Sequence, residues 1–212
     1  MTPEQALAAF EAGVETANTL CDRGNLMIGV GEMGIGNTST SSAVISVLSG
    51  ISPENTAGRG VGLDNTMFQR KKDAIARAIE VNRPDPGDPM DVIAKVGGFD
   101  IAAMAGCFVG AAKRGVACVV DGLISAAAAL CAVRLHPETA GYLFASHTST
   151  EPGFIVACGE TGLKPVLELD MRLGEGSGCP LLFMLFDAAE ALFTKMARLE
   201  TTGLSTEDLA TT

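Results

Sequence analysis

A glutamate opens a glycine-rich turn near the start of the chain, in a pattern that suits the binding of an anion. The run from Gly31 to Thr38 reads GEMGIGNT, so Glu32 precedes the glycines at positions 34 and 36. Glycines at such a turn let backbone N–H groups converge on a phosphate, and a helix that begins there adds the positive end of its dipole. The residues of this anion-binding turn are Gly34, Ile35, Gly36, Asn37 and Thr38.

The spacing of these glycines distinguishes the turn from two common phosphate loops. It differs from the dinucleotide-binding fingerprint, and it lacks the Lys-Ser/Thr pair that ends a P-loop. An ordinary turn between a strand and a helix remains an alternative, because glycine-rich turns are common at such joints.

A second glutamate, Glu175, lies between glycines in the run Arg172–Gly178, which reads RLGEGSG. Gly174 and Gly176 leave its carboxylate unshielded by neighbouring side chains, so it could approach a ligand and accept a proton as a general base. The same run, which includes Ser177, also fits a capping turn whose glutamate is stabilised by the dipole of the next helix. Local sequence leaves both interpretations open.

Basic residues gather in one part of an otherwise acidic chain. Arg59 lies between glycines in the run GRGVGLDN, and Arg70, Lys71 and Lys72 follow it. Such a patch could neutralise a phosphate or a carboxylate. The lysines also fit the solvated face of an amphipathic helix, so Arg59 is the better candidate from local sequence.

Two further polar positions invite a functional interpretation. Asp121 follows an apolar run and could contact a ribose hydroxyl, although an acid at a strand end is often a turn or cap residue. His147 follows Ser146, but a Ser-His-acid triad is disfavoured because the chain has no G-x-S-x-G nucleophile elbow. His136 and His147 are isolated and the six cysteines are dispersed, so we predict no metal site.

These residues need a scaffold, and the pattern of apolar residues predicts one in which strands alternate with helices. Strands are expected at 26–30, 116–120, 142–145 and 165–169. Helices are expected at 2–18, 38–48, 65–81, 90–96, 101–112, 123–135 and 178–200. This order indicates parallel βαβ units, hence an α/β fold with a layered, Rossmann-like parallel sheet flanked by helices. Ligands of such sheets bind beyond the carboxyl ends of the strands, where the polar runs described above fall.

Composition narrows the class of protein. The chain has 212 residues, 47% of them hydrophobic, and a formal net charge of −10, which argues against a general nucleic-acid binder. The scattered cysteines indicate reduced, buried thiols. No secretory signal and no convincing membrane span is visible, so we expect a cytoplasmic protein without a membrane partner. We expect one domain over residues 1–200 and a polar tail over residues 201–212.

The motifs and their order resemble the nicotinate-nucleotide–dimethylbenzimidazole phosphoribosyltransferase family of cobamide (vitamin B12-type) biosynthesis. The similar runs begin at Gly31 (GEMGIGNTST), Gly58 (GRGVGLDN), Val96 (VGGFDIAAMAG), Val119 (VVDGLISAAAAL), Ser146 (SHTSTEPGF) and Asp170 (DMRLGEGSG). They follow one another in family order, and the resemblance extends from about Met1 to Glu200.

The resemblance implies a reaction and a role for each motif. Members of the family transfer phosphoribose from nicotinate mononucleotide to a benzimidazole, with inversion at the anomeric carbon. Glu175 would be the general base, and Glu32 a second carboxylate near the sugar or base. The turn at Gly34–Thr38 would hold the phosphate, and Lys71 or Lys72 would neutralise it. No cofactor is implied, and a homodimer is expected, for which the apolar helix at 101–112 could pack on a second subunit or in the core.

The chain also departs from the family pattern. Family members carry an additional segment before the helix that corresponds to Thr2–Asn18, and it contributes to a smaller domain and to the benzimidazole pocket. We therefore expect the smaller helical domain to be incomplete. Two other hypotheses remain: a truncated or split, non-catalytic nucleotide-binding module that needs an N-terminal partner, and the same transfer to a different aromatic acceptor, such as a phenol or a purine.

Overall fold

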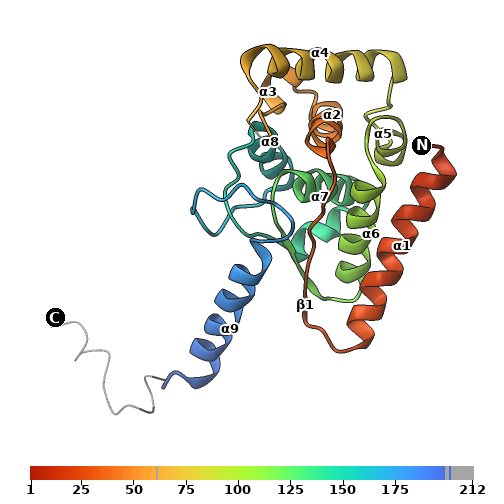
Figure 1. The fold of residues 1–212 in the computed structure, drawn as a ribbon. Helices are drawn as coiled ribbons and strands as arrows, with labels where there is room; N and C mark the ends of the chain where they lie inside the picture. Colours follow the sequence, from red (N-terminus) through yellow and green to blue (C-terminus); the bar gives the residue numbers. More distant parts are fainter. Residues whose placement is uncertain (61, 199–200, 202–212) are drawn as a thin grey trace.

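The α/β class that the sequence predicts is confirmed by a computed structural model, which describes residues 1–60, 62–198 and 201. Three parallel strands and several helices follow one another along the chain (Figure 1). The strands are β1 (Met27–Gly29), β2 (Ala117–Val120) and β3 (Leu143–Ala145). The helices are α1 (Pro3–Asp22), α2 (Asn37–Ser49), α3 (Pro53–Thr56), α4 (Asn65–Asn82), α5 (Pro89–Val96), α6 (Phe99–Lys113), α7 (Leu123–Leu135), the 3₁₀ helix η1 (Pro137–Tyr142), α8 (Pro152–Thr161) and α9 (Cys179–Lys195).

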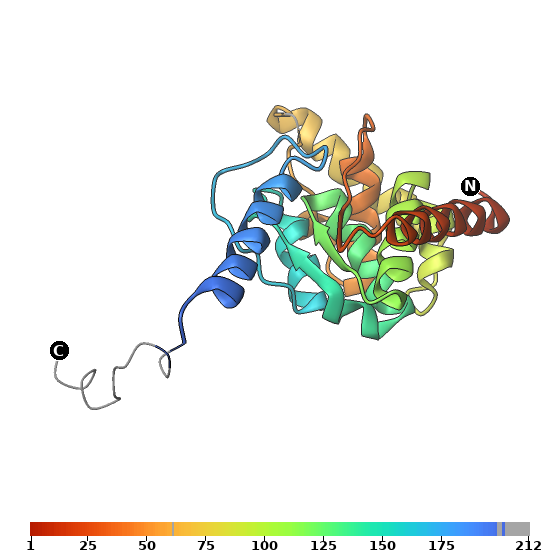
Figure 2. The ribbon, with the colours of Figure 1, turned by 90° about the horizontal axis from the view of Figure 1, so that it is seen from below.

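The sheet has the order β1-β2-β3, and each of its two faces packs against a different hydrophobic cluster. Cys118 and Val120 of β2 belong to the main core, whereas Val119 between them packs with Cys179 and Leu182 of α9. This alternation follows from the period of two along a strand. The main core therefore lies on the side of α6 and α7, and α9 covers the opposite face (Figure 2).

Helix α1 packs closely along α6 because glycines remove side chains from the contact. A Cβ placed on Gly106 would lie 1.9 Å from the carbonyl oxygen of Phe10, and one on Gly13 would lie 1.9 Å from that of Ala103. The start of α1 is fixed by a capping box between Thr2 and Gln5. Helix α6 packs between α1 and α7, and most of its residues are buried within this one chain. Of the two expectations for the helix at 101–112, packing in the core is therefore the one observed.

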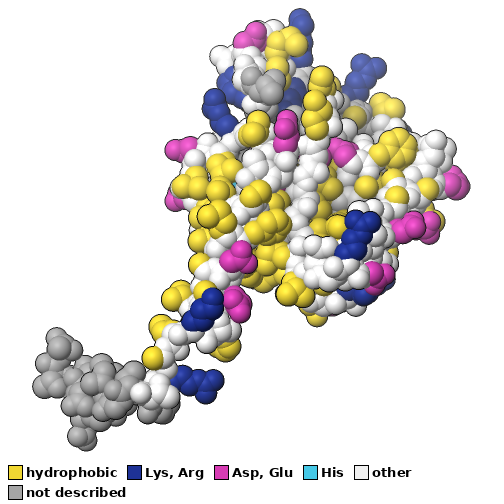
Figure 3. All heavy atoms as spheres, turned by 60° about the horizontal axis from the view of Figure 1, so that its bottom comes forward, with side chains coloured by type: hydrophobic (Ala, Val, Ile, Leu, Met, Phe, Trp, Pro, Cys, Tyr) yellow, Lys and Arg dark blue, Asp and Glu magenta, His cyan; other side chains and the backbone are white. Residues whose placement is uncertain are grey.

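Helix α9 extends away from the rest of the molecule (Figures 1 and 2). Its first turns pack on the sheet, where Phe186 meets Phe144 edge to face at a ring-centroid distance of 4.9 Å. Its far end exposes large apolar side chains, among them Leu192, Phe193 and Met196. The space-filling view shows apolar side chains gathered on the body of the molecule, and apolar, basic and acidic side chains interspersed on the arm that extends from it (Figure 3).

The predicted strand at 165–169 is wrong. Only Leu167 forms a bridge there, with His147, and hydrogen bonds tie the segment to the end of β3 through the amides of Val166 and Leu167. Pro165 has no N–H to donate, which limits the pairing to a few bonds. Helices α3, α8 and η1 were not predicted. The last helix was expected to run to Glu200, but α9 ends at Lys195, where Met196 adopts an extended conformation. Glu200 and almost all of the expected tail at 201–212 lie outside the described residues.

Candidate active site

A cleft of about 1290 Å³ lies at the carboxyl edge of the sheet. It is lined by the segments that follow β1, β2 and β3 and by the loop before α9. The predicted site residues that line the cleft are Glu32, Gly34, Ile35, Gly36, Asn37, Thr38, Arg59, Lys71, Asp121, Gly174 and Glu175. Lys72, Gly176 and Ser177 are not part of this lining. Four loops that are distant in sequence thus meet at one site, as parallel strands dictate.

The start of α2 forms one end of the cleft. Gly36 precedes the helix with φ 90°, a conformation that favours glycine, and no side chain caps the helix start. The amides of the first turn therefore face the cleft with the positive end of the helix dipole. The ammonium group of Lys71 donates to the Thr38 hydroxyl at 3.0 Å and to the Gly58 carbonyl at 2.8 Å. This end of the cleft is suited to an anion.

A glutamate lies behind the ammonium group of Lys71. Glu151 accepts the amide of Gly60 on Oε1 at 2.9 Å, and its buried Oε2 has no hydrogen-bond partner among the residues that the structure describes. Burial lowers the pKa of Lys71, and the nearby Glu151 carboxylate partly offsets this effect. A Cβ on Gly58 would lie 1.9 Å from Glu151 Oε2, so a side chain at position 58 would require the Glu151 carboxylate to move.

The other two basic candidates are already engaged in contacts with the protein. Arg59 donates to the Leu63 carbonyl at 2.8 Å and to Asn65 Oδ1 at 2.6 Å, and it lies over the ring of Phe68 at 4.8 Å. Lys72 pairs with Glu54 and contacts the same ring at 4.9 Å. Arg59 still lines the cleft, whereas Lys72 belongs to the interface between α3 and α4.

Carboxylates gather beside Asn37, the first residue of α2. The Asn37 amide donates to Glu32 Oε2 and also to Asp100 Oδ2, the latter at 3.0 Å. Burial is the main cause that raises the pKa of Glu32. The hydrogen bond from Asn37 lowers the pKa by less, and the nearby carboxylates of Asp100, Asp121 and Glu175 each add a smaller rise. A carboxylate with a raised pKa is a better proton acceptor than a free one, which fits a role in acid–base chemistry.

Glu175 is held in an unusual backbone conformation. It has φ 58°, and its neighbours Gly174 and Gly176 have φ 78° and 74°, so three consecutive residues are left-handed. A side chain in this region costs about 1–2 kcal/mol, and the backbone is observed there only when the surroundings impose it. The loop also touches the first turn, because a Cβ on Gly31 would lie 2.3 Å from the Gly176 nitrogen. Two glycine-rich segments thus bring Glu32 and Glu175 to the same end of the cleft.

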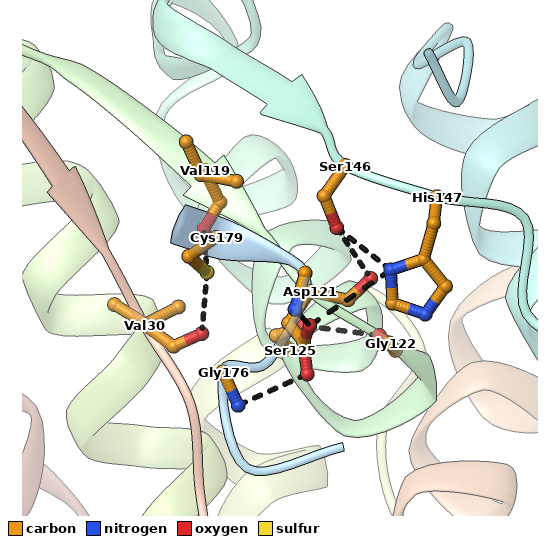
Figure 4. Close-up of polar contacts among 10 residues, drawn as sticks. Val30, Val119, Asp121, Gly122, Ser125, Ser146, His147, Gly176 and Cys179 are labelled. Carbon is orange, nitrogen blue, oxygen red and sulfur yellow. Dashed lines mark hydrogen bonds and ion pairs between the residues drawn. The ribbon is translucent and has the colours of Figure 1, made fainter. Parts of the chain in front are cut away.

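Asp121 lies against the backbone of this loop, with the Gly176 amide directed at its carboxylate (Figure 4). Its side chain is 2% exposed, and its two carboxylate oxygens accept the amides of Gly178 at 2.7 Å and Gly176 at 3.1 Å. The predicted ribose contact stays a prediction. Ser177 is also turned inward, and its hydroxyl has no hydrogen-bond partner within the described ranges.

Exposed apolar side chains lie beside the two glutamates. Met33 follows Glu32 and is 80% exposed, and Leu173 of the Glu175 loop is 70% exposed. Both line the cleft, as does the fully exposed Ile35. Large apolar groups left open next to polar ones are typical of a binding site for a flat organic ligand.

Sequence reasoning gave no role to Asp100, Glu151, Met33 or Leu173. Asp100 and Glu151 lie at the starts of α6 and α8, where an acid is ordinary, so their types gave no reason to select them. Among the described residues, no group of three or more His, Cys, Asp and Glu side chains is placed to bind a metal ion. Likewise, none of the described helices is long and apolar enough to cross a membrane.

The family is shown by comparison with known proteins. A sequence model of the family described as Phosphoribosyltransferase (DBI_PRT) matches residues 1–204. The chain belongs to this family of phosphoribosyltransferases, which confirms the resemblance stated from the motifs.

Its curated relatives carry the name nicotinate-nucleotide–dimethylbenzimidazole phosphoribosyltransferase. One from Clostridium tetani is 51% identical over 199 residues, which are 94% of this chain and 55% of the relative. One from Acetivibrio thermocellus is 47% identical over 200 residues, 94% of this chain and 57% of the relative. A crystal structure of CobT from Thermus thermophilus superimposes with a TM-score of 0.91 at 40% identity, covering 97% of this chain and 61% of that one. The chain thus spans little more than half the length of these relatives.

Proposed function

We propose that this chain carries the nucleotide-binding and base-bearing part of a phosphoribosyltransferase that moves phosphoribose from nicotinate mononucleotide to dimethylbenzimidazole. The observation that carries the proposal is the set of groups that line one cleft. A helix N-terminus and Lys71 lie in the same cleft as Glu32, Glu175 and exposed apolar side chains. A ligand with both a phosphate and a reactive ring matches this set.

The chemistry needs few groups from the protein. A ring nitrogen of the benzimidazole attacks the anomeric carbon, and the bond from that carbon to the nicotinate nitrogen breaks. Nicotinate leaves with the electron pair, so its positively charged ring nitrogen becomes neutral. The second benzimidazole nitrogen loses its proton, and the Glu175 carboxylate accepts it. The products are α-ribazole phosphate and nicotinate, a step in the lower-ligand branch of cobalamin biosynthesis.

Positioning would supply much of the rate. Thr38, Lys71 and the amides of Gly34–Asn37 would fix the phosphate, and Met33 and Leu173 would contact the faces of the aromatic ring. Holding two reactants in line in this way is worth about 7 kcal/mol or more in favourable cases. Glu32, with its raised pKa, would interact with the sugar or base as the second carboxylate.

Two other functions remain proposals of lower rank. The second proposal is a nucleotide-binding module that needs an N-terminal partner for turnover; the chain spans 55–57% of the length of the relatives named above. The open apolar rim at Met33, Ile35 and Leu173 would also admit another aromatic acceptor, such as a phenol or a purine. A homodimer and a cytoplasmic location stay proposals, supported by the exposed apolar side of α9 and by five buried cysteine thiols.

The deciding experiment is an assay of the chain with nicotinate mononucleotide and dimethylbenzimidazole. Formation of α-ribazole phosphate supports the transferase. Binding of the nucleotide in calorimetry without any product supports the module, and recovery of activity with a separately supplied N-terminal segment of a relative identifies a split enzyme. Failure of the folded chain to bind the nucleotide contradicts both. Assays with a panel of aromatic acceptors test the third function, which is transfer of phosphoribose to an acceptor other than dimethylbenzimidazole.

Glu175→Gln tests the base directly. We expect turnover to fall by about 100-fold or more, since general-base catalysis typically contributes 10²–10⁴-fold, while the affinity for nicotinate mononucleotide changes less than about twofold. Glutamine keeps the size and the backbone requirement of the side chain but cannot accept the proton. An equal loss of turnover and nucleotide affinity would reject the general-base assignment.

A further inference from the structure

The most constrained part of the site is the support of Glu175. We propose that Asp121 is a positioning residue, whose buried carboxylate holds residues 174–178 in the left-handed turn that presents Glu175 to the cleft. The inference deepens the proposed function and rests on it for the role of Glu175. It assigns to Asp121 a task other than contact with the ribose.

The first argument is the pair of hydrogen bonds. Asp121 Oδ1 accepts the Gly178 amide at 2.7 Å and Oδ2 accepts the Gly176 amide at 3.1 Å (Figure 4). Hydrogen bonds to an ionised acceptor are stronger than neutral ones, particularly where little water competes. One donor directly follows Glu175 and the other lies three residues after it, so the carboxylate fixes the backbone on the carboxyl side of the strained residue.

The second argument is the backbone strain at Glu175. Gly174 and Gly176 adopt positive φ without steric cost, but Glu175 between them has φ 58° and carries a side chain, which is unfavourable there. Within the loop itself, the bonds across the turn are those from Ser177 to Gly174 and from Cys179 to Gly176, each at 3.0 Å. Contacts from outside the loop must therefore supply much of what keeps Glu175 in place, and Asp121 supplies two.

The third argument is that Asp121 is itself held rigidly. It directly follows the last residue of β2, and its main-chain carbonyl accepts from the Ser146 hydroxyl at 3.3 Å. That hydroxyl also lies 2.9 Å from His147 Nδ1. His147 Nδ1 lies 3.9 Å from Asp121 Oδ1. No space remains above this group, because a Cβ on Gly178 would lie 2.4 Å from both Ser146 Oγ and His147 Nδ1. Asp121 thus links the loop that carries Glu175 to the carboxyl ends of β2 and β3.

Amide hydrogen exchange tests the support without any need for activity. In Asp121→Asn, one of the two acceptors becomes an NH₂ group that faces an amide donor. We expect Gly176 and Gly178 to exchange about 10-fold faster or more, with α6 and α7 unchanged. Asp88→Asn is the matched control, because Asp88 accepts the amides of Met90 and Asp91 at 3.0 and 3.2 Å far along the chain from the site. Unchanged exchange in the Glu175 loop of Asp121→Asn would overturn the proposal.

Kinetics then separate positioning from ligand contact. We expect Asp121→Asn to lower kcat by about 10- to 100-fold while the Kd for nicotinate mononucleotide stays within about twofold, because a small displacement of a catalytic group has effects of this size. In a protein that already carries Glu175→Gln, adding Asp121→Asn should not lower kcat below the value of the single Glu175→Gln variant. A raised Kd with normal kcat would show a ribose contact instead and overturn the proposal. If the wild-type chain shows no turnover, the proposed reaction fails, and exchange in the loop still decides the role of Asp121.

Discussion

Glu32 shares its surroundings with three other carboxylates, and this crowding has a consequence for stability. The raised pKa means that the folded state holds the proton of Glu32 more tightly than the unfolded state does. The stabilisation linked to that proton is therefore complete below the ordinary pKa of 4.5 and is lost as the pH rises through the raised value.

Glu32→Gln should remove this loss, because glutamine stays neutral at every pH and its oxygen can still accept from Asn37. We expect the variant to melt at a higher temperature than the wild type at pH 8 and at the same temperature at pH 4. Thermal unfolding followed by circular dichroism at both pH values measures the effect. A variant that melts lower at pH 8 would show that the charged Glu32 stabilises the fold.

Lys71 and Lys72 are neighbours in sequence with opposite surroundings, which makes them a matched pair. Lys71 reaches Thr38 at the start of α2, whereas Lys72 is paired with Glu54. We expect Lys71→Met to weaken the binding of nicotinate mononucleotide by about 10- to 100-fold, as the loss of a charge-assisted hydrogen bond implies.

The same change at Lys72 should alter the affinity less than about twofold, and calorimetry compares the two variants. Because burial lowers the pKa of Lys71, the advantage of the wild type over Lys71→Met should also fade as the pH rises through that lowered value. Equal losses of nucleotide affinity in both variants would contradict the assignment of Lys71 to the phosphate.

At the scale of elements, the sequence predicts most of the strands and helices but not all of their boundaries. The three strands and seven of the helices follow from apolar periodicity, since each has a clear face or a continuous buried run. Helix α8 was missed because Pro152, Gly153 and Gly159 suggest a loop, although proline at the first helical position is favourable. Contacts such as those from Asp121 to the Glu175 loop join residues more than fifty positions apart, and periodicity does not encode them.

The close contact of α1 with α6 gives a test at this scale. Gly106→Ala would place a Cβ 1.9 Å from the Phe10 carbonyl oxygen, so the two helices must separate. We expect the free energy of unfolding to fall by about 1–3 kcal/mol, as overpacking of a tight contact implies. Gly159→Ala in α8 is the control, because its Cβ would meet no atom within 4 Å and alanine favours a helix. Denaturant titration of both variants provides the comparison.

At the scale of the whole molecule, the far end of α9 leaves apolar side chains in water. Leu192, Phe193 and Met196 are 62%, 91% and 69% exposed. A patch of this kind promotes association, so we expect the chain to self-associate as its concentration rises. Sedimentation should show that Leu192→Glu/Phe193→Glu shifts the protein toward the monomer. Ala12→Glu/Thr19→Glu on the exposed side of α1 adds the same charge and should leave the distribution unchanged.

The left-handed turn at Gly174–Gly176 also limits how this protein can vary. Positions 174 and 176 are glycines, so position 175 is the one place in this turn that carries a functional group. Moving the base to position 174 or 176 would put a side chain on another residue with positive φ and add strain. Met33 and Leu173 carry no such backbone requirement, since neither has a positive φ. Directed evolution toward new acceptors would therefore be most productive at the apolar rim, with the turn left as it is.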